Sequence, residues 1–378
     1  MTRLDSVLTA IKDSGLDALL VTTPVNTYYL SGFRAVAYTR PIYVLVCDEP
    51  VLIVPELELE HARDKSIIKE IEQYSDDDFG SEKNQSPQVA ALNKILAVSR
   101  RKGLDAEKLG FEQAAISYAA FEQLSNLFPG KLEATPPIVE KMRVIKDAEE
   151  IELIHAGCRL ADLGMDVEIT KTVPGVTELD LMLEAAAAMT REGMIRYPDY
   201  TLDAGARPIT GLKTVLPHSI PTGNKVRSGD VVIHGTGCMC EGYHSENERT
   251  LIVGRPNNDQ RKFFNLMLLS QQRAFDSIKP GIRCRLVDLA AREVVREAGY
   301  SRYFLHRTGH SMGLGIHETP FFAPTDETIL EPGMIMTVEP GIYVPGLGGF
   351  RHSDTILVTE TGFEFLTTTP RKLESLIV

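Results

Sequence analysis

Short runs of β-branched and aliphatic residues alternate with amphipathic stretches over the first 135 residues, and this alternation constrains the fold most. The runs DALLVTT, IYVLVC and PVLIVP are typical of short strands, whereas PQVAALNKILAVSRRKG has helical spacing and ends at a glycine. Strands that alternate with helices predict an α/β sheet. Two prolines in EATPP (133–137) interrupt helix and strand alike, so we predict a first domain of residues 1–135.

The remaining residues, 136–378, show a different order of elements and form the second predicted domain. Two long helical patterns come first, strands follow Tyr197, two more helices follow Asn257, and the chain closes with strands rich in glycine and proline. Seven of the nine histidines lie after residue 215. We therefore expect the chemistry of the protein in the second domain.

Charge and composition exclude several classes of protein. The net charge of −12 disfavours a general nucleic-acid binder, which needs a basic face to neutralise phosphates. No apolar run approaches the ~20 residues that span a bilayer, and the first residues read as an amphipathic helix without a signal-peptide core. The five cysteines are scattered and odd in number, as in reduced proteins. These features predict a cytoplasmic protein without nucleic-acid or membrane partners.

Four segments of the second domain combine titratable side chains with glycine and proline. They are LPHSIPTGN (216–224), GYHSENERT (242–250), HRTGHSMGLGIHETP (306–320) and TVEPGIYVPGLGGFRHSD (337–354). Glycine permits close approach of the backbone and proline makes turns rigid. Each segment alone has an ordinary structural explanation, but four such segments in one domain indicate a functional site.

The second domain resembles the pita-bread (M24) family of prolidases, aminopeptidases P, methionine aminopeptidases and creatinases. The resemblance rests on LPHSIPTGNKVRSGDVVI, TGHSMGLGIHETP, LEPGMIMTVEPGIY and RHSDTILVT, and on NTYYLSGF in the first domain. It implies an α/β (α+β) protein with a smaller N-terminal domain of the creatinase/prolidase type. The C-terminal pita-bread domain would contain a curved antiparallel sheet covered by helices.

The resemblance also implies where a metal would bind. Metal-dependent members hold two divalent ions with two Asp, one His and two Glu, and these positions fall here on Gly235, Glu246, His310, Glu339 and Ser353. Glycine and serine remove two carboxylates that two close cations need, so no metal cofactor is expected. The alternative is one divalent ion (Mn, Co, Zn or Fe) held by Glu246, His310 and Glu339. The neighbouring His234 should point to the opposite face of its strand.

The site pattern is similar to that of the metal-independent members, creatinase and ectoine hydrolase. This similarity implies that Glu248 and Glu339 hold a cationic substrate and that His218 moves protons, and we take these three residues as catalytic. We predict a metal-independent hydrolase of C–N bonds in a small carboxylate-bearing amidine, guanidine or cyclic amide, with His218 as general acid/base. Glu246 or Glu248 as a covalent nucleophile stays an open alternative.

Further residues are predicted to bind substrate. In the second domain they are Glu246, His310, His317 and Arg351. The resemblance implies a homodimer in which the N-terminal domain of one subunit completes the site of the other. Arg40 would then bind the substrate carboxylate and Tyr38 would line the pocket.

Two other functions remain open. GHSMGLGIHETP and VEPGIYVPG look prolidase-like, which favours an Xaa-Pro dipeptidase or aminopeptidase with an altered one-metal site and a dipeptide substrate. The other alternative is a catalytically inactive binding protein of the same fold. The presence of His218, Glu248, His310 and Glu339 argues for an enzyme over that binding protein.

Overall fold

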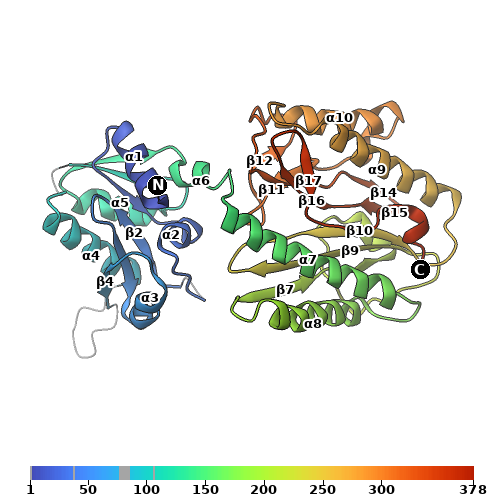
Figure 1. The fold of residues 1–378 in the computed structure, drawn as a ribbon, viewed down its shortest axis with the longest axis horizontal. Helices are drawn as coiled ribbons and strands as arrows, with labels where there is room; N and C mark the ends of the chain where they lie inside the picture. Colours follow the sequence, from blue (N-terminus) through green and yellow to red (C-terminus); the bar gives the residue numbers. More distant parts are fainter. Residues whose placement is uncertain (1, 37–38, 76–85, 105–106) are drawn as a thin grey trace. The chain divides into compact units, whose positions relative to one another are not determined.

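The computed structural model describes residues 2–36, 39–75, 86–104 and 107–378 (Figure 1). By its internal contacts the chain divides into two compact units, Met1–Met142 (unit 1) and Arg143–Val378 (unit 2). The division follows the short helix α6 (Ile138–Met142), whereas the boundary predicted from the sequence falls at the end of the preceding strand, β6 (Lys131–Thr135).

Unit 1 contains a six-stranded mixed sheet in the order β4-β3-β2-β1-β5-β6. β1 pairs antiparallel with β2 but parallel with β5, which pairs parallel with β6. Every residue of β1, β2 and β3 is buried, which explains why these strands read as continuous apolar runs. The remaining strands are β1 (Ala18–Val21), β2 (Tyr43–Val46), β3 (Val51–Pro55), β4 (Glu70–Tyr74) and β5 (Lys108–Glu112).

The helices of unit 1 begin at residues that cap them. Ser86 and Ser117 accept hydrogen bonds from backbone N–H groups in the first turns of α4 and α5. α4 buries an apolar face that includes Ala91 and Ile95. The helices are α1 (Arg3–Asp13), α2 (Pro24–Ser31), α3 (Leu59–Lys65), α4 (Pro87–Arg101) and α5 (Tyr118–Leu127). The predicted α/β class is confirmed for this unit.

Unit 2 consists of antiparallel strands covered by four long helices. One sheet has the order β10-β9-β7, with β8 also paired to β9, another has the order β12-β11-β13-β16-β17, and β14 and β15 form a hairpin. The strands are β7 (Leu202–Ala206), β8 (Ile209–Thr210), β9 (Val231–Cys240), β10 (Asn247–Ile252), β11 (Gly309–Ser311), β12 (Glu318–Phe322), β13 (Ile335–Val338), β14 (Gly341–Val344), β15 (Gly348–Arg351), β16 (Asp354–Val358) and β17 (Phe363–Phe365). The predicted antiparallel, helix-covered architecture is confirmed.

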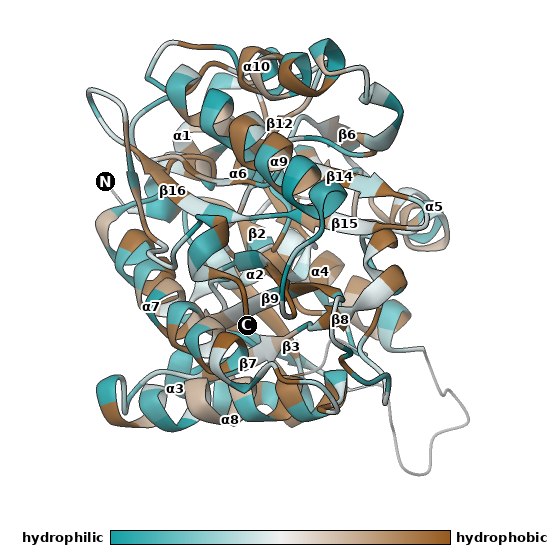
Figure 2. Ribbon diagram, turned by 90° about the vertical axis from the view of Figure 1, so that its right-hand side faces the viewer, coloured by the Kyte–Doolittle hydropathy of each residue, from teal (hydrophilic) through white to brown (hydrophobic). Residues whose placement is uncertain are grey.

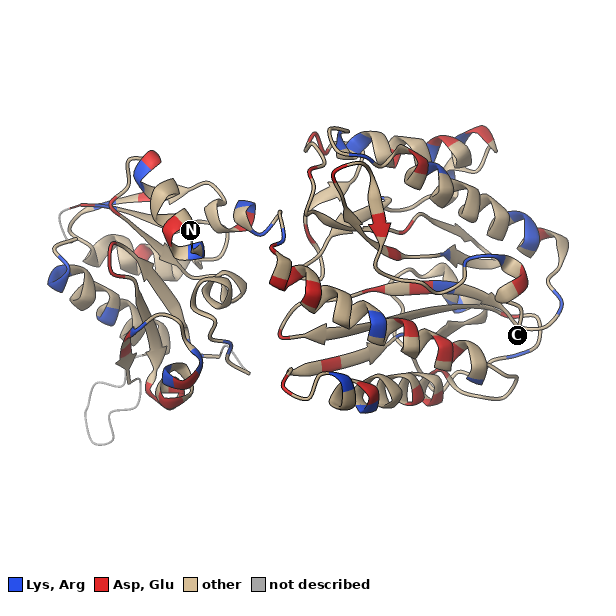
Figure 3. Cartoon of the chain, viewed as in Figure 1, with Lys and Arg blue, Asp and Glu red and all other residues tan. Residues whose placement is uncertain are grey.

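The four helices pack on the sheets through apolar stripes. α7 (Ala148–Lys171) packs on β9 and α8 (Glu178–Arg196) on β7, whereas α9 (Asn258–Ser277) and α10 (Cys284–Glu297) pack together over the other strands (Figure 1). Brown and teal residues alternate around α7, α8 and α9 in Figure 2, as amphipathic helices require. Charged residues of both signs lie along these helices in Figure 3.

A bridge between Glu248 of β10 and Ser353 joins the two sheets of unit 2. The two residues exchange backbone hydrogen bonds of 3.0 Å in both directions. This bridge brings the segment 242–250 beside the segment 337–354, which lies about a hundred residues later in the sequence. Elsewhere, none of the helices in the described parts of the chain is both long and apolar enough to cross a membrane.

Candidate active site

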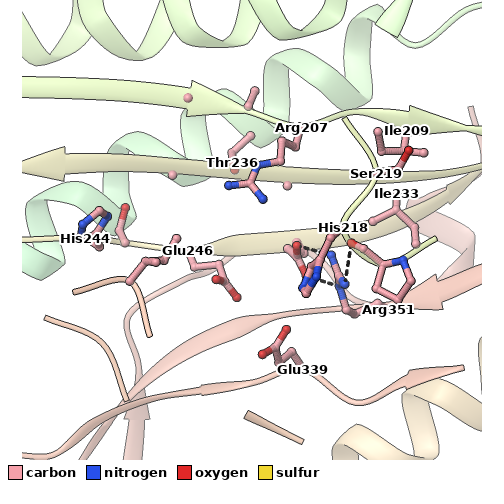
Figure 4. Close-up of a pocket in the computed structure, with 18 of the residues that line it drawn as sticks. Arg207, Ile209, His218, Ser219, Ile233, Thr236, His244, Glu246, Glu339 and Arg351 are labelled. Carbon is pink, nitrogen blue, oxygen red and sulfur yellow. Dashed lines mark hydrogen bonds and ion pairs between the residues drawn. The ribbon is translucent and has the colours of Figure 1, made fainter. Parts of the chain in front are cut away.

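A cavity of about 390 Å³ opens in unit 2 and collects side chains from all four polar segments (Figure 4). β9, β10 and β15 contribute to its wall, together with the loop that carries His218. The predicted residues that line it are His218, Glu246, Glu248, His317, Glu339 and Arg351. His310 is fully buried beneath them. The structure therefore brings together every predicted site residue of the second domain.

Glu246, His310 and Glu339 form the group that can hold a metal ion. Nε2 of His310 lies 3.2 Å from Oε1 of Glu339 and 3.7 Å from Oε2 of Glu246. In the described parts of the chain, these three residues are the one group with three such ligand atoms within 4.8 Å of one another. Three residues that lie far apart in the sequence therefore form one compact group of two carboxylates and an imidazole in the folded chain.

The orientation of His310 suits a metal ligand. Its Nδ1 lies 3.1 Å from the carbonyl oxygen of Ser311, to which an Nδ1–H donates. Its Nε2 is buried and makes no hydrogen bond of good geometry with the described residues, although it faces both carboxylates. An imidazole fixed through one nitrogen, with the other directed at carboxylates, is the usual arrangement around a metal ion. The residues present therefore fit one divalent cation.

The pKa values in this group are perturbed in opposite directions. Burial, and then repulsion by Glu339, raises the pKa of Glu246 to about 7. Burial also acts to raise the pKa of Glu339, but the imidazole of His310, 3.2 Å away, outweighs it and lowers that pKa to about 2. Burial acts to lower the pKa of His310, yet the two carboxylates raise it overall. Protons thus balance negative charge here, and a bound cation would displace them.

The two altered ligand positions have new surroundings. Gly235 of β9 lies directly opposite Glu248 of β10 in the strand register. The Ser353 hydroxyl donates a hydrogen bond of 2.6 Å to Oε1 of Glu246. His234 is fully buried on the other face of β9, where its Nδ1 lies 3.2 Å from Oε2 of Glu168. The predicted direction of His234 is confirmed, and this residue does not reach the cavity.

Glu248 is bound by Arg351 through both of its carboxylate oxygens. Nε of Arg351 donates to Oε2 at 2.5 Å and Nη2 donates to Oε1 at 2.6 Å. Nη1 of the same guanidinium donates to the hydroxyl of Tyr343 at 3.0 Å. Glu248 thus already has a cationic partner within the chain. This pairing removes the physical basis for a second, substrate-derived guanidinium on that carboxylate.

His218 lies on a loop that Glu178 ties down at both ends. Glu178, at the start of α8, accepts hydrogen bonds from the backbone N–H groups of Thr210 at 3.0 Å and Thr222 at 2.7 Å. Nζ of Lys213, in the short 3-10 helix between them, donates to the same carboxylate at 2.8 Å. The loop places the exposed His218 at the edge of the cavity.

His317 stands edge-on to His310. Their ring centroids are 4.2 Å apart with an interplanar angle of 82°. Burial, and then the neighbouring charge of His310, lowers the pKa of His317 to about 4. His317 is therefore a neutral imidazole near pH 7, which can both donate and accept a hydrogen bond.

Sequence reasoning missed two residues of the site. The Arg207 side chain extends into the cavity from the end of β7 (Figure 4) and has no ion pair or hydrogen bond with the described residues. Tyr343 bridges His306, at 2.8 Å from Nε2, and Arg351. Tyr343 had a detectable signal, since it lies in PGIYVPG close to Glu339, whereas nothing in the pattern around Arg207 marks that residue.

The two predicted residues of the first domain have different outcomes. Arg40 lies in unit 1, where it borders a separate cavity near the starts of α2, α4 and α5. Tyr38 lies outside the described residues. Their roles in the site of a partner subunit stay predictions.

Comparison with known proteins identifies the family. Residues 152–360 match the model of metallopeptidase family M24, and residues 3–145 match the creatinase/prolidase N-terminal domain. An Xaa-Pro dipeptidase of Pyrococcus furiosus is 33% identical over an alignment of 378 positions. The alignment covers 98% of this chain and 99% of that protein.

Solved structures give the same result. An Xaa-Pro dipeptidase from Bacillus anthracis has a TM-score of 0.86 and 30% identity over 100% of this chain and 99% of its own. The prolidase from Pyrococcus horikoshii OT3 has a TM-score of 0.84 and 30% identity over 98% and 99% of the two chains.

These findings confirm the resemblance and correct the predicted reaction. The prediction of a metal-independent hydrolase of amidines, guanidines or cyclic amides is wrong, because the full-length relatives are Xaa-Pro dipeptidases. The prediction relied on Glu248 as a site for a cationic substrate, and the structure places Arg351 on that carboxylate. This chain is a hydrolase of C–N bonds and belongs to metallopeptidase family M24.

Proposed function

We propose that this protein is an Xaa-Pro dipeptidase that uses one divalent ion, of Mn, Co, Zn or Fe, held by Glu246, His310 and Glu339. The observation that carries the proposal is the compact cluster of these three residues at the cavity, with the buried His310 directing its Nε2 at two half-buried carboxylates. Three protein ligands with an open position are an ordinary catalytic arrangement. Full-length similarity to Xaa-Pro dipeptidases supports the substrate class.

The ion, when bound, supplies a Lewis acid that polarises the peptide carbonyl and lowers the pKa of a bound water. The chain itself supplies proton carriers and orientation. We assign proton transfer to the leaving nitrogen to His218, at the edge of the cavity. His317 stays neutral near pH 7, because its pKa is lowered, and it orients the peptide by hydrogen bonding.

A dipeptide also brings a free carboxylate, and Arg207 is placed to receive it. Arg207 extends into the cavity (Figure 4), and the described residues offer its guanidinium no carboxylate. A guanidinium binds a carboxylate through two parallel hydrogen bonds. Arg207 therefore favours dipeptides with a free carboxylate over amides.

The proposal includes the surroundings of the enzyme. We infer a homodimer in which Arg40 of one subunit contacts the substrate in the other, which sedimentation and mixing of Arg40→Ala with an inactive subunit would test.

A cytoplasmic location agrees with five cysteines that are all buried and unpaired.

Peptide hydrolysis before and after metal removal tests the proposed function. Protein stripped with EDTA should not release proline from Ala-Pro, and Mn²⁺ should restore the release. His310→Ala should stay inactive after Mn²⁺ is added, whereas His155→Ala, a change on the outer side of α7, should behave as wild type. Undiminished hydrolysis after stripping, or turnover of creatine in place of Xaa-Pro dipeptides, would refute the proposal.

A further inference from the structure

The Glu248–Arg351 ion pair lies beside the cluster that we assign to the metal. Glu248 shares the cavity with Glu246 and Glu339, so its carboxylate is available by position as a further metal ligand. Arg351 occupies both oxygens of that carboxylate at 2.5 and 2.6 Å and is itself only 9% exposed. A buried bidentate pair of this kind is among the strongest ion pairs in proteins. Arg351 therefore withholds Glu248 from a cation.

A side chain at the position opposite Glu248 would crowd the Glu248 carboxylate. Gly235 faces Glu248 across the β9–β10 pair, and a Cβ atom at Gly235 would lie 3.2 Å from Oε1 of Glu248. A larger side chain at position 235 would displace the carboxylate that Arg351 holds. The absence of a side chain at Gly235 therefore leaves the room that the Glu248–Arg351 ion pair occupies.

The other end of the cluster is also closed to a second ion. Ser353 donates its hydroxyl proton to Oε1 of Glu246 at 2.6 Å, and its backbone is fixed by two hydrogen bonds to Glu248. A neutral donor at this point uses a lone pair of Glu246 and adds no negative charge. Position 353 therefore supports one oxygen of Glu246 and does not extend the ligand set.

Charge balance agrees with this geometry. Glu246, Glu248 and Glu339 carry three carboxylates, and Arg351 neutralises one of them. The remaining two match the charge of one divalent ion. A second divalent ion beside Glu248 would meet the fixed guanidinium of Arg351, so repulsion would oppose it.

We propose that the Arg351 guanidinium is the permanent second cation of this site, so that the Glu248–Arg351 pair closes the neighbouring metal position and the centre takes a single divalent ion. This inference deepens the proposed function, because it rests on the metal cluster assigned there. The site would then contain two positive charges. One is the exchangeable divalent ion, and the other is the guanidinium of Arg351, which belongs to the chain.

The test counts bound Mn²⁺ in the purified full chain, with no peptide present. Wild-type protein equilibrated with excess Mn²⁺ and freed of unbound metal should retain one ion per chain by elemental analysis. Its electron paramagnetic resonance spectrum should be that of isolated Mn²⁺ ions without exchange coupling. Two ions per chain, a coupled spectrum, or no retained Mn²⁺ would each overturn the inference.

Two variants test the part played by the ion pair. Arg351→Gln releases Glu248 and should raise the bound Mn²⁺ above one ion per chain. The quadruple change Gly235→Asp, Glu248→Ala, Arg351→Gln and Ser353→Glu, which replaces the pair by two new carboxylates, should bind about two. Arg207→Gln is the matched control, because it removes a cation from the same cavity without freeing Glu248, and it should stay at one.

The results separate this inference from the proposed function. If Arg351→Gln is folded by circular dichroism and still binds one ion, Arg351 does not close a second position and the inference fails. If Arg351→Gln does not fold, the quadruple variant decides: one ion per folded chain would overturn the inference. A protein that binds one Mn²⁺ and hydrolyses no Xaa-Pro dipeptide would refute the dipeptidase proposal and leave the single-ion site intact.

Discussion

Glu178 offers a direct test of how the fold positions His218. Its side chain is fully buried, and it accepts hydrogen bonds from Thr210, Thr222 and Lys213, so it holds both ends of the loop that carries His218. Glu178→Gln keeps the size of the side chain. The amide places an NH₂ group or an uncharged oxygen where Lys213 and the N–H of Thr222 now donate to a carboxylate.

The size of the effect follows from these bonds. A hydrogen bond to a charged group contributes about 1.5–3 kcal/mol and a neutral one about 0.5–1.5 kcal/mol. Glu178→Gln removes the negative charge to which two or three donors bind. This loss should lower the free energy of unfolding of unit 2 by about 3 kcal/mol. For a unit of this size, that corresponds to a fall in Tm of roughly 6–12 °C. Because the loop carries His218, kcat/KM of the folded variant should also fall roughly 10- to 100-fold.

The pH dependence has a defined sign. Burial acts to raise the pKa of Glu178, but the hydrogen bonds from Lys213, Thr210 and Thr222 outweigh it and hold that pKa below the ordinary 4.5. A lowered folded-state pKa contributes stability that is fully present above pH 4.5 and is lost as the pH falls through the lowered value. The stability difference between Glu178→Gln and wild type should therefore be largest near pH 7 and shrink in acid.

Urea unfolding and calorimetry at several pH values measure this difference. Glu192→Gln is the control on the same helix, since Glu192 makes an exposed ion pair with Arg196 and should cost less than about 1 kcal/mol. The reasoning is refuted if Glu178→Gln costs no more than Glu192→Gln, or if its cost does not change between neutral and acidic pH.

Three further predictions follow from other contacts. Arg207→Gln should raise KM for Ala-Pro about tenfold or more, with kcat little changed, and should leave KM for Ala-Pro amide unaltered; equal shifts for both peptides would exclude carboxylate binding. Asp354→Asn should lower the free energy of unfolding by about 3–5 kcal/mol in urea, because it leaves the fully buried Arg249 without its carboxylate at 2.7 Å, and a loss below about 1 kcal/mol would contradict this. Gly157→Ala should lower Tm, because the new Cβ would lie 2.5 Å from a backbone carbonyl oxygen of β9, whereas Gly164→Ala meets a flexible methionine and should be tolerated better; the reverse order by calorimetry would contradict the packing argument.

Much of the fold could be predicted from short-range patterns. The apolar runs of β1, β2 and β3 and the amphipathic spacing of α4 are local, because the periods of strands and helices extend over a few residues. The family resemblance implied Glu246, His310 and Glu339, since the motifs that carry the resemblance are contiguous in the sequence. These three residues do meet in the structure.

The reaction could not be predicted from the same motifs. Glu248 before Arg249 favoured a cationic substrate when read along the chain, because a carboxylate in a motif shows no partner. Its partner, Arg351, lies 103 residues away and reaches it only because Ser353 bridges to β10. Arg207 had no signal at all, since its place in the cavity depends on where β7 ends.

The sequence by itself thus determined the α/β class of unit 1, the order of elements and the positions along the chain of the three residues that we propose to hold a metal ion. The tertiary structure alone decided which charges are paired: Arg351 on Glu248, Ser353 on Glu246, and His234 turned towards Glu168. The physical reason is range. Secondary-structure periodicity acts over neighbouring residues, whereas the pairing of charges depends on distances of a few ångströms between strands that only the folded chain brings together.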